Sequence, residues 1–328
     1  MKLLVISNNP DRASFRQRIG IYLDILRTNG INCTVAKLPS GYLARQKLFR
    51  QAVGFDGVFL QKKCLNFFDA FWLRKYSRKI IYDFDDAVMY DPDAPEHNSY
   101  EHFSPFRRTV KLADLVVAGN SYLAEHAKKF SPRVEMLPTG LDVKTYKVEN
   151  KPASDGKIRL VWIGSKSTLR YLAEIKPTLE EISSRFDNVV LRIISDEFLD
   201  LQNIPVEKHP WSLETQVTDL VTSDIGLAPL PDNRFTRGKC AFKILQYAAA
   251  GLPVVASLVG VNSMFVRDGV TGFVVPDLYE WSDRIAKLIT DSGLRQTMGR
   301  VNQSMVQSYD VSVLGKCFVN MIMRILKQ

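Results

Sequence analysis

The stretch RFTRGKCAFKILQYAAAGLPVVAS, residues 234–257, decides the fold. Its middle, KILQYAAA, consists of good helix formers, and Gly251 followed by Pro253 is expected to end that helix. The run PVVAS that follows is short, apolar and rich in valine, which is typical of a buried strand. A helix that passes through a glycine cap directly into a buried strand indicates an α/β protein.

The same alternation extends in both directions along the chain. The first half contains the apolar runs KLLVIS, NCTVAKL, GVFL, KIIYDF, LVVAG and VEMLP, and the second half contains IRLVWIG, VVLRIIS, VEKH, DIGLAPL and PVVAS. Helical patterns lie between these runs, including one at residues 17–28 and one at residues 168–185 that Pro177 is expected to kink. Apolar strands that alternate with helices predict parallel sheets covered on both faces.

The length of 328 residues and a polar stretch near the middle predict two domains. NKPASDG, residues 150–156, is typical of a linker, so we predict domains at residues 1–150 and 151–328. The last helix, about residues 311–328, can pack back on the first domain. Ligands of such sheets bind beyond the carboxyl ends of the strands, which favours a site in a cleft between the two halves.

The composition excludes several classes of protein. Hydrophobic residues make up 46% and charged residues 24%, as in ordinary globular proteins. No apolar run reaches the roughly 18–20 residues of a membrane-spanning helix. The four cysteines and four histidines show no metal-ligand spacing, so we expect a reduced cytoplasmic protein with no metal site. No G-x-G-x-x-G follows the first strand, which argues against a dinucleotide-dependent oxidoreductase.

The net charge of +9 is concentrated in one segment. Residues 41–80 hold nine lysines and arginines against two aspartates, with aromatic residues between them. One interpretation is a pair of amphipathic helices with solvated basic faces, and the other is a surface for an anionic membrane or an anionic acceptor. No nucleic-acid recognition module accompanies the segment, so we expect no nucleic-acid partner.

Positive charge also gathers just before the helix that begins near Phe242 and inside its first turn. Arg237, Gly238, Lys239 and Lys243 lie there, and helix N-termini present free N–H groups and positive potential. Cations at such a terminus are unfavourable unless an anion joins them, so the pattern predicts a diphosphate site. The alternative is a surface helix with a basic first turn.

Several pieces of the chain, in order, resemble glycosyltransferase family 4 of the GT-B fold, in a bacterial subgroup. They are SFRQR, YDFDDAV, SYLAEHAKKF, VEMLPTGLDVKTY, WIGSKSTLRYL, AGLPVVAS-x-VG-x-N and DG-x-TGF, which together span nearly the whole chain. The resemblance implies two Rossmann-like doubly wound domains that face each other across a cleft. It also implies a nucleotide sugar bound mainly to the second domain, an acceptor held mainly by the first, and retention of anomeric configuration.

The resemblance also implies which residues of the second domain contact the donor. The family has two glutamates at positions that fall here on Gly238 and Gln246, and Gln246 can still bond ribose hydroxyls. Contacts with the donor sugar would then come either from Asp232 or Asn233 or from the backbone N–H groups of Cys240, Ala241 and Phe242. Gly164, Ser165 and Lys166 follow a strand and are candidates for the diphosphate, unless they form a plain turn with Thr168 as helix N-cap.

Acceptor-side candidates lie in the first domain. DFDDA follows an apolar strand, and its aspartates can be read as a metal-binding D-x-D, a phosphohydrolase pair or turn caps. Alignment with the family puts Asp85 where a histidine usually stands, which makes it the candidate general base, with Lys239 as the second catalytic candidate. Arg16, Arg18, Asp86 and Asn120 are acceptor-side candidates, although the arginines can equally be solvated and Ser121 is an obvious helix N-cap.

The sequence therefore predicts a glycosyltransferase that moves a sugar from a nucleoside-diphosphate sugar to a glycan or lipid-linked acceptor in cell-surface polysaccharide synthesis. Fixed cations rather than a metal or cofactor would stabilise the leaving diphosphate. We expect the protein in the cytoplasm, where peripheral contact with the inner face of the cell membrane is an additional option. The alternatives are a nucleotide-sugar epimerase, a phosphorylase, or a non-catalytic homologue that retains nucleotide binding.

Overall fold

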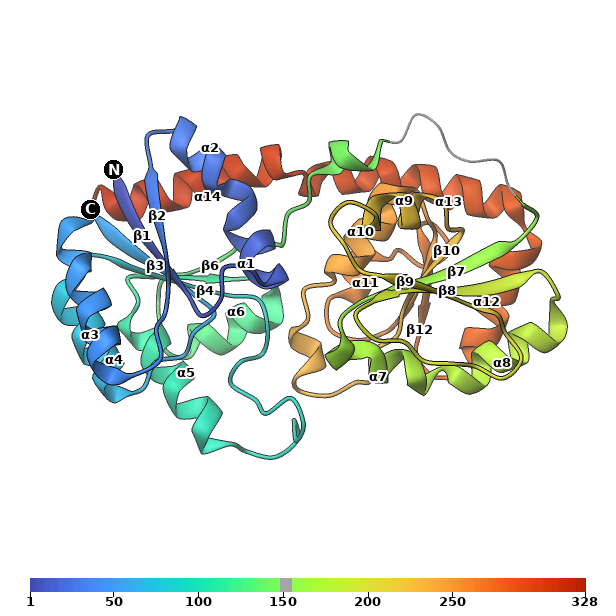
Figure 1. The fold of residues 1–328 in the computed structure, drawn as a ribbon, viewed down its shortest axis with the longest axis horizontal. Coiled ribbons are helices and arrows are strands. Elements are labelled where there is room, and N and C mark those ends of the chain that lie inside the picture. The colour runs from blue at the N-terminus through green and yellow to red at the C-terminus, as the bar shows by residue number, and fades with distance from the viewer. Residues whose placement is uncertain (148–154) are drawn as a thin grey trace. The chain divides into compact units, whose positions relative to one another are not determined.

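The computed structural model describes residues 1–147 and 155–328, and contacts divide them into two units. The first unit contains Met1–Leu141, Asn233–Cys240 and Tyr309–Gln328, and the second contains Asp142–Asp232 and Ala241–Ser308. The predicted boundary at residue 150 and most of the predicted linker lie outside the described residues. Each unit is built on a six-stranded parallel sheet with helices on both faces, as Figure 1 shows, which confirms the predicted fold class.

The first sheet has the strand order β2-β1-β3-β4-β5-β6, with every pair parallel. Its strands are β1 (Lys2–Ser7), β2 (Asn32–Lys37), β3 (Gly57–Gln61), β4 (Ile80–Phe84), β5 (Leu115–Ala118) and β6 (Val134–Met136). The chain builds outward from β1 to β2 and then continues on the other side of β1 with β3. The carboxyl ends of β1 and β3 therefore form a topological switch point, where sheets of this kind bind ligands.

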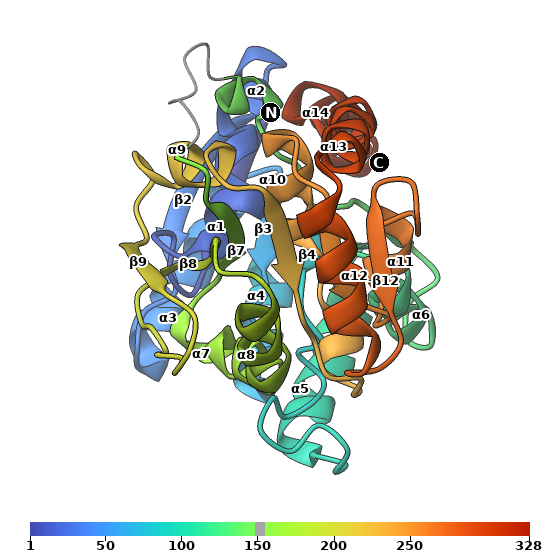
Figure 2. The same cartoon turned by 90° about the vertical axis from the view of Figure 1, so that its right-hand side faces the viewer.

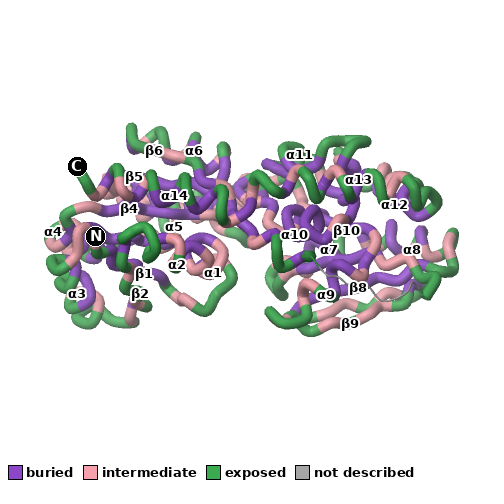
Figure 3. Tube along the Cα trace, turned by 90° about the horizontal axis from the view of Figure 1, so that it is seen from above, coloured by how far each residue is buried: buried purple, intermediate pink, exposed green. Residues whose placement is uncertain are grey.

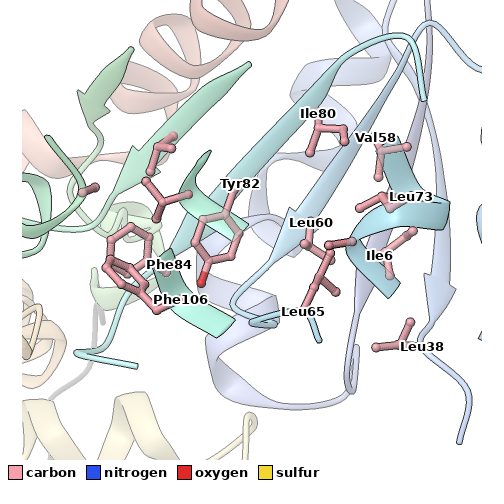
Figure 4. Close-up of a cluster of buried hydrophobic side chains, with 14 of the residues drawn as sticks. Ile6, Leu38, Val58, Leu60, Leu65, Leu73, Ile80, Tyr82, Phe84 and Phe106 are labelled. Carbon is pink, nitrogen blue, oxygen red and sulfur yellow. The ribbon is translucent and has the colours of Figure 1, made fainter. Parts of the chain in front are cut away.

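Helices cover both faces of the first sheet. They are α1 (Ala13–Arg18), α2 (Leu23–Thr28), α3 (Tyr42–Gln51), α4 (Phe67–Tyr76), α5 (Tyr100–Leu112), α6 (Ser121–Lys128) and α14 (Val311–Leu326). Alternate residues of the strands point to opposite faces. Figure 4 shows one face, where Ile6, Leu60 and Tyr82 lie in one buried cluster with Leu73 of α4 and Phe106 of α5. On the other face, α1, α2 and α14 pack on the intervening strand residues.

The second sheet has the strand order β12-β11-β10-β7-β8-β9, again with every pair parallel. Its strands are β7 (Ile158–Ile163), β8 (Val189–Ser195), β9 (Val206–Pro210), β10 (Ile225–Ala228), β11 (Val254–Ser257) and β12 (Gly272–Val275). The chain moves from β7 to β8 and β9 and then returns to the other side of β7 with β10. The switch point of this unit therefore lies at the carboxyl ends of β7 and β10.

The helices of the second unit are α7 (Lys166–Glu174), α8 (Lys176–Arg185), α9 (Gln216–Val221), α10 (Phe242–Ala250), α11 (Asn262–Phe265), α12 (Glu280–Thr290) and α13 (Ser292–Met305). In Figure 2, α8 and α12 lie side by side on one face of the sheet, where both contribute to the buried core. Figure 3 shows that the middle strands are buried, whereas the edge strands β2 and β9 are partly exposed.

Two of the predicted helices are divided in the structure. The pattern at residues 168–185 gives α7 and α8, because the chain breaks at Ile175 and Pro177 takes a place in the first turn of α8. The pattern at residues 17–28 gives the end of α1, a short 3-10 turn at Gly20–Tyr22, and α2. No helix among the described residues is both long enough and apolar enough to cross a membrane.

Candidate functional site

A chain of hydrogen bonds starts at the switch point of the first sheet. Ser7 closes β1 and Gln61 closes β3, and Ser7 Oγ donates to Gln61 Oε1 at 2.9 Å. Gln61 Nε2 donates to Ser14 Oγ at 2.9 Å, and Ser14 Oγ donates to Asp85 Oδ2 at 2.7 Å. These bonds run from two buried strands to the carboxylate that follows β4, so they fix the orientation of Asp85.

Asp85 belongs to a group of four charges, Lys62, Asp85, Asp86 and Lys239, which we call the ionic cluster. Lys62 Nζ lies 3.2 Å from Asp85 Oδ1 and also pairs with Asp86 Oδ2. Lys239 Nζ lies 2.9 Å from Asp86 Oδ1. The side chains are 15–30% exposed, so they are held firmly and still reach solvent.

The charged state of the ionic cluster follows from its mutual contacts. Burial raises the pKa of Asp86, but Lys239 and Lys62 outweigh burial and hold that pKa well below its usual range. Burial lowers the pKa of Lys62, but Asp85 and Asp86 outweigh it and hold that pKa above its usual range. Lys62 and Asp86 are therefore charged throughout the neutral pH range.

Lys62 is held in a backbone conformation that few side chains adopt. Its φ is +62°, in the left-handed region, and its N–H donates to the carbonyl of Asp83 at 2.6 Å. A non-glycine residue in this region costs of order 1–3 kcal/mol and tends to occur at functional sites. The strained turn directs the Lys62 ammonium toward the two carboxylates that follow β4.

Arg18, one of the acceptor-side candidates, is buried in the first unit and paired with an aspartate of β4. Its Nη2 lies 2.5 Å from Asp83 Oδ1 and its Nη1 donates to the carbonyl of Leu137 at 2.6 Å. Burial lowers the pKa of Arg18, but Asp83 reverses that effect and the pKa lies above its usual range. Arg16, also an acceptor-side candidate, donates to the carbonyl of Asp11.

The segment Asn233–Cys240, which we call the docked segment, belongs to the first unit although it lies late in the sequence. Arg234 donates to the carbonyl of Glu96 and to Asn98 Oδ1, both at 3.0 Å. Tyr122 Oη on α6 donates to the carbonyl of Arg234, again at 3.0 Å. The chain therefore passes from the second unit into the first for eight residues and returns at Ala241.

Asn120 fastens the end of the docked segment. Its Nδ2 donates to the carbonyls of Gly238 at 3.0 Å and Lys239 at 3.1 Å. Its Oδ1 accepts from the N–H of Leu123 at 2.9 Å, so Asn120, and not the predicted Ser121, is the N-cap of α6. Both polar atoms of Asn120, a predicted acceptor-side residue, are thus engaged within the first unit.

The docked segment changes where four predicted donor-site residues lie. Arg237, Gly238, Lys239 and Cys240 were assigned to the nucleotide-sugar-binding domain, and the structure places all four in the first unit. Cys240 Sγ donates to the carbonyl of Asp85 at 3.2 Å. Burial raises the pKa of the Cys240 thiol to about 12, so it stays protonated at neutral pH.

Gly238 is required for close packing within the first unit. A Cβ atom at this position would lie 2.6 Å from the Cβ of Ala87 and 2.9 Å from its backbone nitrogen. We expect Gly238→Ala to destabilise the protein by about 1–3 kcal/mol, as overpacking does elsewhere, measured as a lower urea midpoint. Gly54→Ala is the matched control because a Cβ there meets nothing within 4 Å, and an equal effect of both would contradict the packing role.

The switch point of the second unit carries the N-terminus of α10. Ala241 precedes the helix in the left-handed conformation, with φ +53° and ψ 27°, and no side chain caps the terminus. Lys243, in the first turn, places its ammonium 4.3 Å from the ring centroid of Trp162 on β7. The backbone N–H groups of the first turn and one lysine thus lie beside the end of β7, a combination suited to an anion.

The turn after β7 is the second half of this donor-side region. A Cβ on Gly164 would lie 2.5 Å from the Trp162 ring, so only glycine fits there without a shift. Ser165 takes the N-cap position of α7, where Thr168 had been expected. The ammonium of Lys166, another diphosphate candidate, forms an ion pair with Glu197.

Gln246 of α10 is buried and positioned by neighbours in its own unit. Its Nε2 donates to Tyr146 Oη at 3.2 Å and to Gln216 Oε1 at 3.3 Å. Phe242 opens α10, and Asp232 is the last residue of the second unit before the docked segment. The structure thus keeps Ala241, Phe242 and Gln246 on one helix, while Asp232 lies on the other side of the docked segment in sequence.

The aspartates of DFDDA are held by basic side chains. Arg18 pairs with Asp83, and Lys62 with Asp85 and Asp86, which argues against a metal-binding D-x-D. Across residues 1–147 and 155–328, no group of three or more histidine, cysteine or acidic side chains could hold a metal ion.

Sequence reasoning missed Ser14 and Lys62. Lys62 directly follows β3, just as Asp85 follows β4, so the rule that sites gather at strand ends could have found it. Ser14 has no such signal, because its role depends on how α1 packs against the first sheet.

Residues 147–291 match the family model described as "Glycosyl transferases group 1". A curated relative, the D-inositol 3-phosphate glycosyltransferase of Kribbella flavida, is 40% identical over 67 residues. That stretch is 20% of this chain and 16% of the relative, so the sequence match spans only a small part of either protein.

Solved structures resemble the chain over nearly its whole length. The Anabaena protein HepE, solved with UDP and glucose, has a TM-score of 0.73 at 18% identity and covers 99% of this chain and 100% of its own. Sucrose-phosphate synthase from Thermosynechococcus elongatus gives 0.75 at 14% identity, with 98% of each chain covered. WaaG, a glycosyltransferase of lipopolysaccharide biosynthesis, gives 0.70 at 14%, with 98% and 99% covered.

At these identities the structural similarity concerns the fold alone, and the family match concerns most of the second unit together with the docked segment. The two parallel six-stranded sheets are those of the GT-B fold, and residues 147–291 are similar to the glycosyl transferases group 1 family.

Proposed function

We propose that the protein transfers a sugar from a nucleoside-diphosphate sugar to a hydroxyl of a glycan or lipid-linked acceptor. The observation that carries this proposal is the N-terminus of α10, which no side chain caps and which lies in the part of the chain that matches the family. Lys243 and the turn at Gly164 lie beside it at the switch point. Free N–H groups with a nearby cation form the kind of site that binds a diphosphate.

The donor we propose binds the second unit. Backbone N–H groups of Ala241 and Phe242, together with Lys243, hold the diphosphate, and Gln246 approaches the ribose. Arg237 and Lys239 remain proposed contributors of positive charge because they lie four and two residues before Ala241 in the chain. UDP is the first nucleotide to test, since the neighbour HepE was solved with UDP and with UDP-glucose.

The acceptor we propose binds at the ionic cluster of the first unit. The bond from the anomeric carbon to the diphosphate oxygen breaks, and the nucleoside diphosphate leaves with the electron pair. The acceptor oxygen bonds to that carbon from the face that the diphosphate leaves. The acceptor proton passes to Asp85, which Ser14 orients. The negative charge that grows on the diphosphate is stabilised by fixed N–H groups and lysines without a metal ion.

We also propose retention of anomeric configuration and a role in cell-surface polysaccharide synthesis, both on the family resemblance. A lipid-linked acceptor would bring the protein to the inner face of the cell membrane. The non-catalytic alternative has one observation in its favour. The family glutamate that contacts the donor sugar is replaced by Gly238, which packs on Ala87 in the first unit.

The first experiment is thermal unfolding with EDTA and a panel of nucleoside diphosphates and their sugars. At a hundred times Kd, one of them should raise the unfolding temperature by roughly 5–10 °C, because binding then adds about 2.7 kcal/mol. Lys243→Met should remove most of that shift. Lys287→Met is the matched control, since Lys287 also lies over an aromatic ring, 5.5 Å from that of Phe273.

No shift with any nucleotide in the wild-type protein would overturn the proposed donor site. A shift without subsequent turnover of the donor in the presence of candidate acceptors would favour the non-catalytic homologue. Turnover of the donor without any acceptor, giving the epimeric sugar nucleotide, would favour an epimerase.

A further inference from the structure

Helices α3 and α4 expose large apolar side chains that nothing in the described structure covers. Leu43, Phe67 and Phe68 are 75%, 65% and 59% exposed, and Phe71 is 53% exposed. Single exposed apolar residues are common on protein surfaces, but a contiguous group marks an interaction site.

Ring contacts join aromatic side chains of the two helices into one group. Tyr42 at the start of α3 lies edge-on to Phe68 of α4, with ring centroids 5.9 Å apart, and Phe68 lies 5.7 Å from Phe67. Trp72 Nε1 donates to Tyr42 Oη at 2.7 Å. The two helices therefore pack side by side (Figure 1), and two ring contacts and one hydrogen bond link their aromatic residues.

The same surface carries positive charge with no exposed carboxylate from either helix. Asp69 is the only acidic residue in α3 or α4, and it is buried and paired with Arg45 at 2.8 Å. Lys47, Arg50 and Lys75 are exposed. These bases and the aromatic group make up what we call the aromatic–basic face, whose members are Tyr42, Leu43, Lys47, Arg50, Phe67, Phe68, Phe71 and Lys75.

Helical spacing puts the apolar and basic members on shared stripes. On α3, Leu43, Lys47 and Arg50 stand at i, i+4 and i+7, and on α4, Phe67, Phe71 and Lys75 stand at i, i+4 and i+8. In both helices the apolar residues come first and the bases follow. The apolar part of the face thus lies at the helix starts, which follow the carboxyl ends of β2 and β3.

We propose that the aromatic–basic face binds the surface of an anionic lipid bilayer. Its exposed phenylalanines would enter the boundary between headgroups and acyl chains, while its lysines and arginine contact anionic headgroups. Aromatic residues and arginine also occur often at protein interfaces, whereas lysine is depleted there, so the two lysines of the face favour the bilayer over a protein partner. If the proposed function holds, this face also explains how a lipid-linked acceptor is presented, since β3 leads both to Lys62 and on to α4.

The test is sedimentation of the full chain with vesicles of phosphatidylcholine alone or mixed with phosphatidylglycerol. We expect binding to the mixed vesicles that weakens in 0.5 M salt. Lys47→Glu, Arg50→Glu and Lys75→Glu together should weaken binding by at least roughly a hundredfold, because the loss of each of the three positive charges alone costs about fivefold. Phe67→Ser, Phe68→Ser and Phe71→Ser together should weaken it by about tenfold or more.

Matched controls come from exposed residues elsewhere. Leu278→Ser with Tyr279→Ser removes exposed apolar side chains, and Lys287→Glu, Arg300→Glu and Lys316→Glu reverse three exposed charges. Neither control set should change vesicle binding by more than about twofold, since surface changes away from a site have small effects.

Three results would overturn the proposal. They are equal sedimentation with neutral and anionic vesicles, equal loss in the control and face variants, and a self-associated or nucleic-acid-bound chain that the face variants disrupt. The thermal shift with a nucleoside diphosphate serves as the independent readout. It should be unchanged in the face variants, so failure of membrane binding is distinguishable from failure of the donor site.

Discussion

Replacing Arg18 with methionine is expected to lower the free energy of unfolding by about 3–5 kcal/mol, because it leaves the buried carboxylate of Asp83 without its partner. Arg18 and Asp83 are each 1% exposed, so water cannot replace the lost bonds. The carbonyl of Leu137 loses its donor as well. Urea unfolding of the full chain, with hydrogen exchange at the amides of β1 and β4, measures the effect.

Arg16→Met is the matched control for this prediction. Arg16 lies on the same helix and is only partly buried. Its replacement should lower the free energy of unfolding by about 0.5 kcal/mol or less, as at ordinary surface positions. If Arg18→Met and Arg16→Met unfold at the same urea concentration, the buried pair does not stabilise the first unit.

Replacing Asp85 with asparagine is expected to lower kcat by about 10²–10⁴-fold, the usual contribution of a positioned general base. The amide keeps the size of the side chain and can still accept from Ser14, but it cannot take up a proton. The thermal shift with the nucleoside diphosphate should be unchanged, because Asp85 lies in the first unit and the proposed donor site in the second.

Asp24→Asn is the control, since Asp24 is an exposed carboxylate of the same unit that pairs only within α2. Transfer from the donor identified by thermal unfolding to screened glycan and lipid-linked acceptors gives the rates. A wild-type kcat in the Asp85→Asn protein would show that Asp85 is not the general base. A change in KM alone would make it a residue that binds the acceptor without accepting its proton.

Local pattern predicted the parts of the fold that depend on local chemistry. The helix KILQYAAA appears as α10 with Gly251 in the left-handed conformation at its end, and PVVAS contains β11. The kink expected at Pro177 became a break between two helices. Proline favours a helix start as well as a bend, and the sequence does not choose between them.

The candidate site was only partly predictable because much of it is built by contacts distant in sequence. The aspartates at the end of β4 were predicted from their place after a strand. The partner of Asp83 was not, since Arg18 lies 65 residues earlier and its burial depends on the packing of α1. Lys239 was assigned by its neighbours along the chain, whereas its ammonium contacts Asp86, 153 residues away.

The docked segment limits which recombinants between related chains can fold. The chain crosses between the units after Leu141, Asp232, Cys240 and Ser308, so neither unit is one contiguous block of sequence. A recombinant that takes residues 142–308 from a relative would import a foreign docked segment. That segment would then have to fit Asn120, Tyr122 and Ala87 of the recipient. Inheritance of the second unit is thus tied to the surface of α6, and the two units are expected to diversify together.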